Sequence, residues 1–248
     1  MTDVVIVTGA SRGIGAATAL LAARRGYAVC VNYRDNHAAA EMVVGQIESS
    51  GARAIAVAAD ISIESEVMRL FETCDRTLGT LTALVNNAGV LETQRRLEDM
   101  DAARLHRVFA TNVYGSFICA REAVRRMSVK RGGVGGAIVN VSSAASRLGA
   151  AGEYVDYAAS KGALDTLTIG LANEVAEEGI RVNAVRAGFI YTDMHASGGE
   201  PERVDRVKAF VPMKRGGTAA EVAHAIVWLL SREASFTTGS FIEVTGGR

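Results

Sequence analysis

The chain has 248 residues, 49% of them hydrophobic, which is enough for one large α/β domain but leaves no spare length for a second. Its 27 basic and 27 acidic residues balance, so no global field favours a nucleic acid or an anionic membrane as partner. No run approaches the roughly 18 apolar residues of a membrane span. The three cysteines (Cys30, Cys74, Cys119) and the histidines lack the spacing of a disulfide framework or metal site. We therefore expect a soluble, cytoplasmic protein without a metal.

Short apolar runs alternate with helical segments along the chain. The runs predict strands at Val4–Val7, Ala28–Tyr33, Ala54–Ala58, Leu81–Val85, Ala137–Val141, Ile180–Val185 and Ser240–Val244. The intervening segments predict helices that begin near Ala16, Ala38, Glu64, Met100, Val155 and Ala219, the fourth reaching about Met127. The alternation predicts an α/β fold with one domain over residues 1–248. It would be a doubly wound parallel sheet of about seven strands with helices on both faces and ligands at the strands' carboxyl ends.

A glycine-rich turn follows the first expected strand. It reads Thr8-Gly9-Ala10-Ser11-Arg12-Gly13-Ile14-Gly15 and leads into an alanine-rich helical segment. A buried strand that turns through glycines into a helix directs backbone N–H groups and the positive helix end at a phosphate. The glycine spacing differs from G-x-G-x-x-G, but the arrangement predicts a dinucleotide site.

The segment Tyr157-Ala-Ala-Ser-Lys161 sets a phenol and an ammonium one helical turn apart. An unperturbed tyrosine has a pKa of about 10, so it exchanges protons slowly at neutral pH unless a cation stabilises the phenolate. Lys161, four residues after Tyr157, can supply that charge. The same spacing also occurs on solvated helices, so the other motifs decide between the two interpretations.

Further motifs lie between these two. Asn86-Asn87-Ala88-Gly89 follows one apolar run and Ser142-Ser143 closes another, while Asp60 follows the third expected strand and Asn112 lies in the helix from Met100. In this order, with the glycine turn and the Tyr157/Lys161 pair, they resemble the short-chain dehydrogenase/reductase family over essentially the whole chain. The resemblance implies a Rossmann fold and hydride transfer between a nicotinamide cofactor and a ketone or secondary alcohol.

The resemblance also implies the catalytic roles. Tyr157 would be the general acid or base, Lys161 would lower its pKa and hold the nicotinamide ribose, and Asn112 would organise a proton-relaying water. The active serine usually precedes the tyrosine by about thirteen positions, whereas Ser143 and Ser142 precede it by fourteen and fifteen. Alignment on the Val-Ser-Ser strand end favours Ser143 as the active serine and Ser142 as a structural hydroxyl. Tyr154 has no lysine four residues later.

The residues expected to bind the cofactor, from the glycine turn, the charge pattern after the second strand and the resemblance together, are Gly9, Ser11, Arg12, Gly13, Ile14, Gly15, Tyr33, Arg34, Asp60, Ile61, Asn87, Ala88, Gly89, Tyr157, Lys161, Ile190 and Thr192. The second strand ends without an acid before Asp35 that would take the adenosine ribose hydroxyls. Arg12 and Arg34 are able to clamp a 2′-phosphate with charge-assisted hydrogen bonds. We therefore expect NADP(H), with NAD(H) as the alternative because Tyr33 permits dual use.

Two stretches near the expected nicotinamide site stand out. Arg186-Ala187-Gly188 carries alanine where relatives usually have proline, which removes a restraint on the turn. The segment from Thr192 to about Val207 contains Gly198-Gly199 and is expected to cover the substrate as a mobile lid. His195 within it is either a surface residue or a substrate contact.

The substrate stays open at this point. The segment Asn32-Tyr33-Arg34 resembles bacterial glucose 1-dehydrogenases, whereas the general pattern also resembles 3-oxoacyl-carrier-protein reductases. For the latter, the basic residues Arg125, Arg126, Lys130 and Arg131 would dock an acidic carrier protein, or they would form a solvated helix end. An interpretation from a different functional class is a protein that binds the nicotinamide cofactor as a sensor and has lost catalysis.

The helices from Met100 and Val155 are apolar over more of their circumference than one sheet contact requires. The residues concerned include Val113, Phe117, Leu164, Leu167 and Leu171. In the family the corresponding helices pair across a two-fold axis, and the final strand, here Phe241–Val244, supports a second interface. We expect a homotetramer, with a dimer as the fallback.

Overall fold

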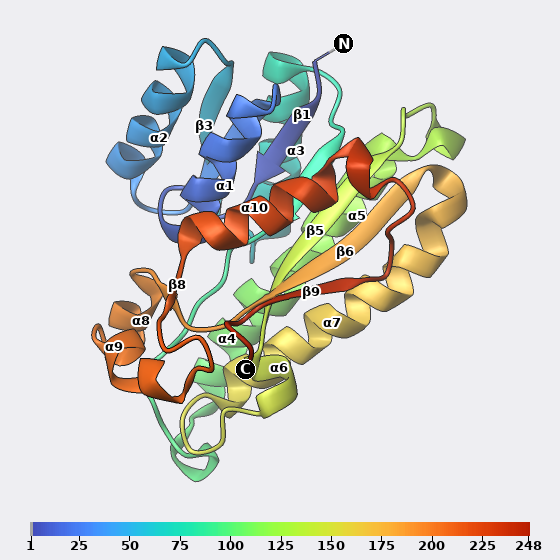
Figure 1. The fold of residues 1–248 in the computed structure, drawn as a ribbon. Helices are drawn as coiled ribbons and strands as arrows, with labels where there is room; N and C mark the ends of the chain where they lie inside the picture. The colour runs from blue at the N-terminus through green and yellow to red at the C-terminus, as the bar shows by residue number, and fades with distance from the viewer. Residues whose placement is uncertain (1) are drawn as a thin grey trace.

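The computed structural model describes residues 2–248. Its centre is a seven-stranded parallel sheet in the order β3-β2-β1-β4-β5-β6-β9 (Figure 1). The strands are β1 (Val4–Val7), β2 (Ala28–Tyr33), β3 (Ala54–Ala58), β4 (Ala83–Asn86), β5 (Gly136–Ser143), β6 (Ile180–Ala187) and β9 (Phe241–Val244). The strand order reverses between β1 and β4, the place where a doubly wound sheet opens a ligand crevice. The expected fold class is confirmed.

Helices cover both faces of the sheet (Figure 1). One layer holds α1 (Gly13–Arg24), α2 (His37–Ser49) and α10 (Ala219–Leu230), and the other holds α3 (Glu64–Leu78), α5 (Ser116–Met127) and α7 (Val155–Val175). Along β1, Val5 and Val7 join the first core while Val4 and Ile6 join the second. This alternation explains why the strand is apolar at every position. Cys30, Cys74 and Cys119 are free and lie in the second core.

Several short elements gather at the carboxyl edge of the sheet. They are the paired strands β7 (Ile190–Tyr191) and β8 (Gly217–Thr218) and the helices α6 (Ala145–Leu148), α8 (Met194–Ser197) and α9 (Arg203–Val207). The sequence did not predict them because elements of two to five residues are too short to show a hydrophobic period. Among residues 2–248, none of the helices has both the length and the apolar character needed to cross a bilayer.

The helix expected from Met100 to Met127 is not one regular α-helix. It consists of α4 (Ala102–Phe109), a π-helical turn over Ala110–Gly115, and α5. The turn carries Asn112, whose Oδ1 accepts from the Val90 amide at 2.7 Å while its Nδ2 donates to the Val90 carbonyl at 3.1 Å. Nδ2 also donates to Ser160 Oγ at 3.0 Å. A π turn adds one residue to a helical turn. Here the extra residue turns the Asn112 side-chain amide towards the Val90 backbone, and hydrophobic periodicity does not predict such a turn.

Candidate active site

Two joined pockets lie along the crevice at the carboxyl edge. The longer one, of about 460 Å³, runs from the glycine turn past the end of β2 to the loop after β4. The second, of about 300 Å³, extends from the end of β5 to the segment after β6. Ile14, Asn87, Leu91, Thr192 and Met194 line both. Of the residues predicted to bind cofactor or act in catalysis, all except Gly15 and Asn112 line one of these pockets.

The glycine turn has the shape of a phosphate cradle. Gly9 adopts φ +61°, a left-handed conformation that favours glycine. At Gly15, an added Cβ would lie 2.5 Å from both Asn87 Nδ2 and the Gly9 carbonyl oxygen, so only glycine allows this approach. Helix α1 begins without a side-chain cap or an acidic residue in its first turn. Its first N–H groups and positive end are thus left for an anion, which is the fit that a dinucleotide pyrophosphate requires.

Two polar residues to which the sequence analysis gave no role of their own hold this cradle together. The Thr8 hydroxyl accepts from the amides of Asn87 and Ala88, each at 3.0 Å, and joins the glycine turn to the Asn-Asn-Ala-Gly segment. The buried Asn32 side chain accepts from the Gly9 amide at 3.2 Å and donates to the Ala59 carbonyl at 3.0 Å. Their signal in the sequence was a polar residue at the end of an apolar run.

The end of β2 bears the side chains relevant to cofactor choice. Arg12 and Arg34 are exposed and line the same end of the longer pocket, while Asp60 and Ile61 lie on its wall. Arg34 forms a surface ion pair with Asp35, Nε to Oδ2 2.6 Å. The Tyr33 ring is buried, and its hydroxyl is hydrogen-bonded to His37 Nδ1 at 2.8 Å.

Tyr157, Lys161 and Ser143 meet where the second pocket reaches the sheet. Lys161 is 2% exposed, its Nζ donates to the Val141 carbonyl at 2.8 Å, and it lies 5.6 Å from the Tyr157 ring centroid. Burial raises the pKa of Tyr157 to about 12, opposed by a hydrogen bond with Ser143. Burial also lowers the pKa of Lys161 to about 8, opposed by the Asp165 carboxylate. Desolvation of the phenolate therefore dominates the pKa of Tyr157, and an acidifying effect of Lys161 on it stays a prediction.

The two serines at the end of β5 face different surroundings. Ser143 lies beside Tyr157, and its Oγ accepts from the Ala145 amide at 3.1 Å. Ser142 is buried, and its hydroxyl donates to Asp165 Oδ1 at 2.6 Å on the side of α7. Since side chains alternate along a strand, only one of the two is able to face the phenol. Asn112 stands behind the site, bonded to Val90 and Ser160.

A buried ion pair supports the start of α7. Arg104 on α4 donates from Nε and Nη2 to the two carboxylate oxygens of Asp156, at 2.8 and 3.2 Å. The two side chains are only 4% and 0% exposed. Arg104 also donates to the Thr93 carbonyl at 2.5 Å, which ties the loop after β4 to the same point. Asp156 immediately precedes Tyr157, so the pair fixes the first turn that carries the phenol.

The segment expected to be a lid lies over the second pocket through Met194, His195 and Arg203. Arg203 is 7% exposed and pairs with Glu153 at 2.5 Å and Glu200 at 2.9 Å. Its guanidinium also lies over the rings of Tyr154 and Phe189, at 5.0 and 5.5 Å.

Tyr154 and His195 both belong to the pocket wall. The Tyr154 hydroxyl donates to the Gly198 carbonyl at 3.4 Å, so this tyrosine packs against the lid. His195 Nδ1 is buried without a hydrogen-bond partner among residues 2–248, and burial lowers the pKa of the ring. The mobility of the lid stays a prediction.

Comparisons match the chain to known oxidoreductases. Residues 9–248 match the family model described as enoyl-(acyl carrier protein) reductase. The chain is 62% identical over 245 residues to the uncharacterized oxidoreductase YgfF of Escherichia coli, covering 99% of each chain. It is 36% identical to the 3-oxoacyl-[acyl-carrier-protein] reductase FabG of Staphylococcus aureus (100% of this chain, 98% of the relative). For glucose 1-dehydrogenase 2 of Bacillus subtilis the identity is 35% (98% and 93%).

A solved structure gives the same answer for the fold. A dehydrogenase/reductase from Sinorhizobium meliloti superimposes with a TM-score of 0.91 at 32% identity, over 99% of this chain and 94% of that one. The match spans the sheet, both helical layers and the segments that line the pockets. The chain is therefore an oxidoreductase of the short-chain dehydrogenase/reductase family.

Proposed function

We propose that this protein is an NADP(H)-preferring carbonyl reductase or alcohol dehydrogenase that acts on a compact ketone or the matching secondary alcohol. The observation that carries the proposal is that Ser143, Tyr157 and Lys161 meet in the second pocket, which shares Ile14 and Asn87 with the longer one. A cofactor along the longer pocket would bring its nicotinamide end to these side chains. When bound, it supplies or accepts the hydride.

The chain's own residues would handle the proton and the orientation of the substrate. Ser143 orients the carbonyl oxygen, and Tyr157 gives its proton to that oxygen as negative charge develops there. Because burial raises the pKa of Tyr157, the phenol is protonated at neutral pH but is a weak acid, and it needs a cation beside the phenolate to give up its proton. Lys161 holds the ribose hydroxyls and stabilises the phenolate left behind. Asn112 fixes the backbone at Val90 and, through a water, returns the proton by way of Lys161.

The walls of the second pocket favour a compact substrate with an apolar body. Leu91, Leu148, Phe189 and Met194, with several alanines, make up much of the lining. A sugar needs a set of free hydrogen-bonding side chains, but here Glu153 is paired with Arg203. These observations favour an apolar ketone, α-diketone or quinone over glucose. His195 also lines this pocket, and its ring would offer a polar contact to a second oxygen of such a substrate.

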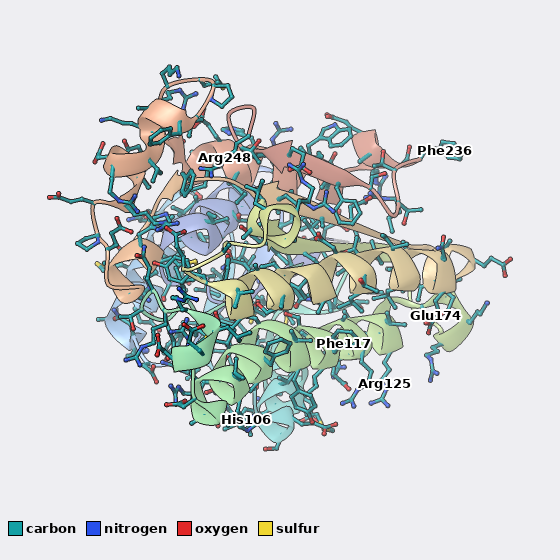
Figure 2. The ribbon with its side chains drawn as sticks, turned by 90° about the horizontal axis from the view of Figure 1, so that it is seen from below. His106, Phe117, Arg125, Glu174, Phe236 and Arg248 are labelled. Carbon is teal, nitrogen blue, oxygen red and sulfur yellow. The ribbon has the colours of Figure 1, made fainter. Side chains whose placement is uncertain are left out.

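The carrier-protein alternative has less support from the basic residues. Arg125 and Arg126 are both paired with Glu122, and Arg126 is also paired with Asp75. The cluster spans the last turn of α5 and the residues just after it, at the end of the sheet where β5 begins, and Figure 2 shows Arg125 at the end of α5 remote from α4. The length of β5, roughly 25 Å, separates this end from Ser143. A carrier docked there would lie far from the same chain's site.

The exposed arginines support NADP(H) as the preferred cofactor. Arg12 and Arg34 lie at the pocket end where the adenosine ribose would bind, and the wall at Tyr33 has no acid to take its hydroxyls. The Arg34 to Asp35 pair is exposed, so it is weak and a phosphate is able to replace it. NAD(H) remains the alternative.

The exposed apolar side chains on α5 and α7 support a homotetramer. These two helices lie side by side in Figure 2, with Phe117 on the face they share. Phe117 and Ile169 are 46% and 49% exposed. Large apolar side chains that are this exposed on neighbouring helices favour contact with a second copy of the chain. Leu164 is buried inside the chain and cannot contribute. The free, buried cysteines support a reducing, cytoplasmic location.

The test is NADPH and NADH oxidation with a panel of ketones, α-diketones, quinones, sugar lactones and an acetoacetyl thioester. We expect turnover with NADPH and a compact apolar carbonyl, abolished in Tyr157→Phe. If cofactor binds but no carbonyl in the panel is reduced, the sensor alternative gains. Preference for the lactone or the thioester would overturn the substrate class while leaving the reaction class intact.

A further inference from the structure

A row of polar side chains crosses the sheet one residue before Ser143. Ser142 on β5 is in register with Arg186 on β6, and Arg186 is in register with Glu243 on β9. Paired residues of neighbouring parallel strands point to the same face. This is the face that α7 covers, because the Ser142 and Arg186 side chains both reach Asp165 on that helix.

Asp165 is the centre of the row. Its Oδ1 accepts from Ser142 Oγ at 2.6 Å, and its Oδ2 accepts from Arg186 Nε at 3.0 Å and Nη2 at 2.9 Å. Arg186 in turn donates from Nη1 to Glu243 at 2.9 Å and lies over the Phe241 ring at 4.0 Å. Both carboxylate oxygens are therefore satisfied, and the side chain has one fixed position. Asp165 is 9% exposed, so its charge is little screened by solvent.

Lys161 lies one helical turn before Asp165 on the same side of α7. The Ser142 hydroxyl reaches both residues, because it donates to Asp165 Oδ1 and approaches the main-chain carbonyl oxygen of Lys161 at 3.4 Å. On the same helix, the titratable neighbour of Lys161 is Tyr157. The charged side chains on this side of α7 are Asp165, Arg186 from β6 and Glu243 from β9. Arg186 contacts the Oδ2 of Asp165, and Glu243 lies beyond Arg186. Of these, Asp165 is the carboxylate one helical turn from Lys161, and both side chains are buried, so its negative charge opposes the fall in the pKa of Lys161 that burial causes.

We propose that Asp165 is the buried counter-charge that keeps Lys161 charged, and that Ser142 and Arg186 hold it in place. Asp165 is a positioning residue, because it contacts neither pocket. The inference rests on the proposed function, in which the charged Lys161 stabilises the phenolate of Tyr157. The proposal predicts that the charge of Lys161 depends on Asp165, in the middle of α7, and on the pairing of β5, β6 and β9 that holds Asp165 in place.

The chain allows a direct measurement, because it has only four lysines, Lys130, Lys161, Lys208 and Lys214. Labelling lysine with carbon-13 at Cε gives four NMR signals whose pH titrations report each pKa without substrate or cofactor. Lys161→Arg assigns the signal. In Asp165→Asn we expect the pKa of Lys161 to fall by about one pH unit, because a buried carboxylate one turn away is neutralised. Asp165→Glu, which keeps the charge, should restore most of it.

Two further variants separate the counter-charge from a general structural effect. Asp75→Asn breaks a similar pair, with Arg126 at 2.6 Å, at the other end of the fold and should leave the Lys161 titration unchanged. Arg186→Gln removes a positive charge from the far side of Asp165, so it should raise the pKa of Lys161, the opposite direction. This variant keeps the proposal testable if Asp165→Asn fails to fold, as judged by circular dichroism.

The outcomes are distinct. The counter-charge proposal is overturned if Asp165→Asn leaves the pKa of Lys161 unchanged, or if Arg186→Gln lowers it. Equal shifts in Asp75→Asn would mean that lost stability, not lost charge, moves the lysine. If Lys161 behaves as expected while the parent protein reduces no carbonyl in the panel, the counter-charge holds and the proposed function fails. If carbonyls are reduced, the activity of Asp165→Asn should decline at a lower pH than that of the parent.

Discussion

The buried pair of Arg104 and Asp156 makes a strong prediction about stability. Arg104→Met removes the guanidinium and leaves Asp156, 0% exposed, without either of its two charge-assisted hydrogen bonds. An uncompensated buried charge costs about 3–5 kcal/mol. With a urea m value of about 3 kcal/mol/M, the unfolding midpoint should fall by about 1 M or more. Unfolding is followed at fixed protein concentration by the fluorescence of Trp228, the single tryptophan, because assembly contributes to apparent stability.

The same helix offers a matched control. Arg107 pairs with Glu92 through two hydrogen bonds of 2.8 and 3.0 Å, but its side chain is 58% exposed. Arg107→Met should leave the midpoint nearly unchanged, because water replaces the lost partner. The double variant Arg104→Met/Asp156→Leu should recover much of the stability, because both charges leave together. If Arg104→Met costs no more than Arg107→Met, or if the double variant is as unstable as the single one, burial is not the source of the effect.

Four further outcomes test the site and the assembly. Tyr157→Phe should lower turnover by at least ~100-fold with NADPH affinity retained, and near-normal turnover would contradict its role as the acid. Arg34→Ala should weaken NADPH binding in fluorescence titrations far more than NADH binding. An equal loss of affinity for both cofactors would contradict the proposed phosphate clamp. Gly15→Ala should abolish binding of both cofactors, because its Cβ would collide with Asn87; binding at parental affinity would refute the close approach. Phe117→Glu should reduce the assembly in light scattering, and an unchanged mass would place the interface elsewhere.

The order of the elements could be predicted from the sequence because strands buried on both faces leave a strong signal. Val4–Val7 is apolar throughout and coincides with β1. The pocket residues followed from family motifs at strand ends. Their surroundings did not follow. Burial raises the pKa of Tyr157, and no spacing in the sequence reports burial.

The supporting contacts are beyond sequence reasoning for a different reason. Asp165 and Arg186 are separated by twenty-one positions and Arg104 and Asp156 by fifty-two, and each pair forms only once the sheet and helices are assembled. Charged residues at such positions are usually solvated, so composition alone favours the wrong environment. The same holds for Arg203, which the sequence leaves in a lid but which the structure buries between two rings.

The π turn at Ala110–Gly115 has a consequence for how this chain tolerates insertions and deletions. Deleting Val113 would close the turn into a regular α-helix, in which each residue advances about 100° around the axis. Asn112 would then rotate away from Val90, or else every side chain of α5 would leave its place against the sheet. Gly115 would also lose its register with Ile61, which a Cβ on Gly115 would approach to 2.7 Å. The length of this helix is thus fixed to a single residue, and a deletion scan should find that it does not tolerate the loss of one.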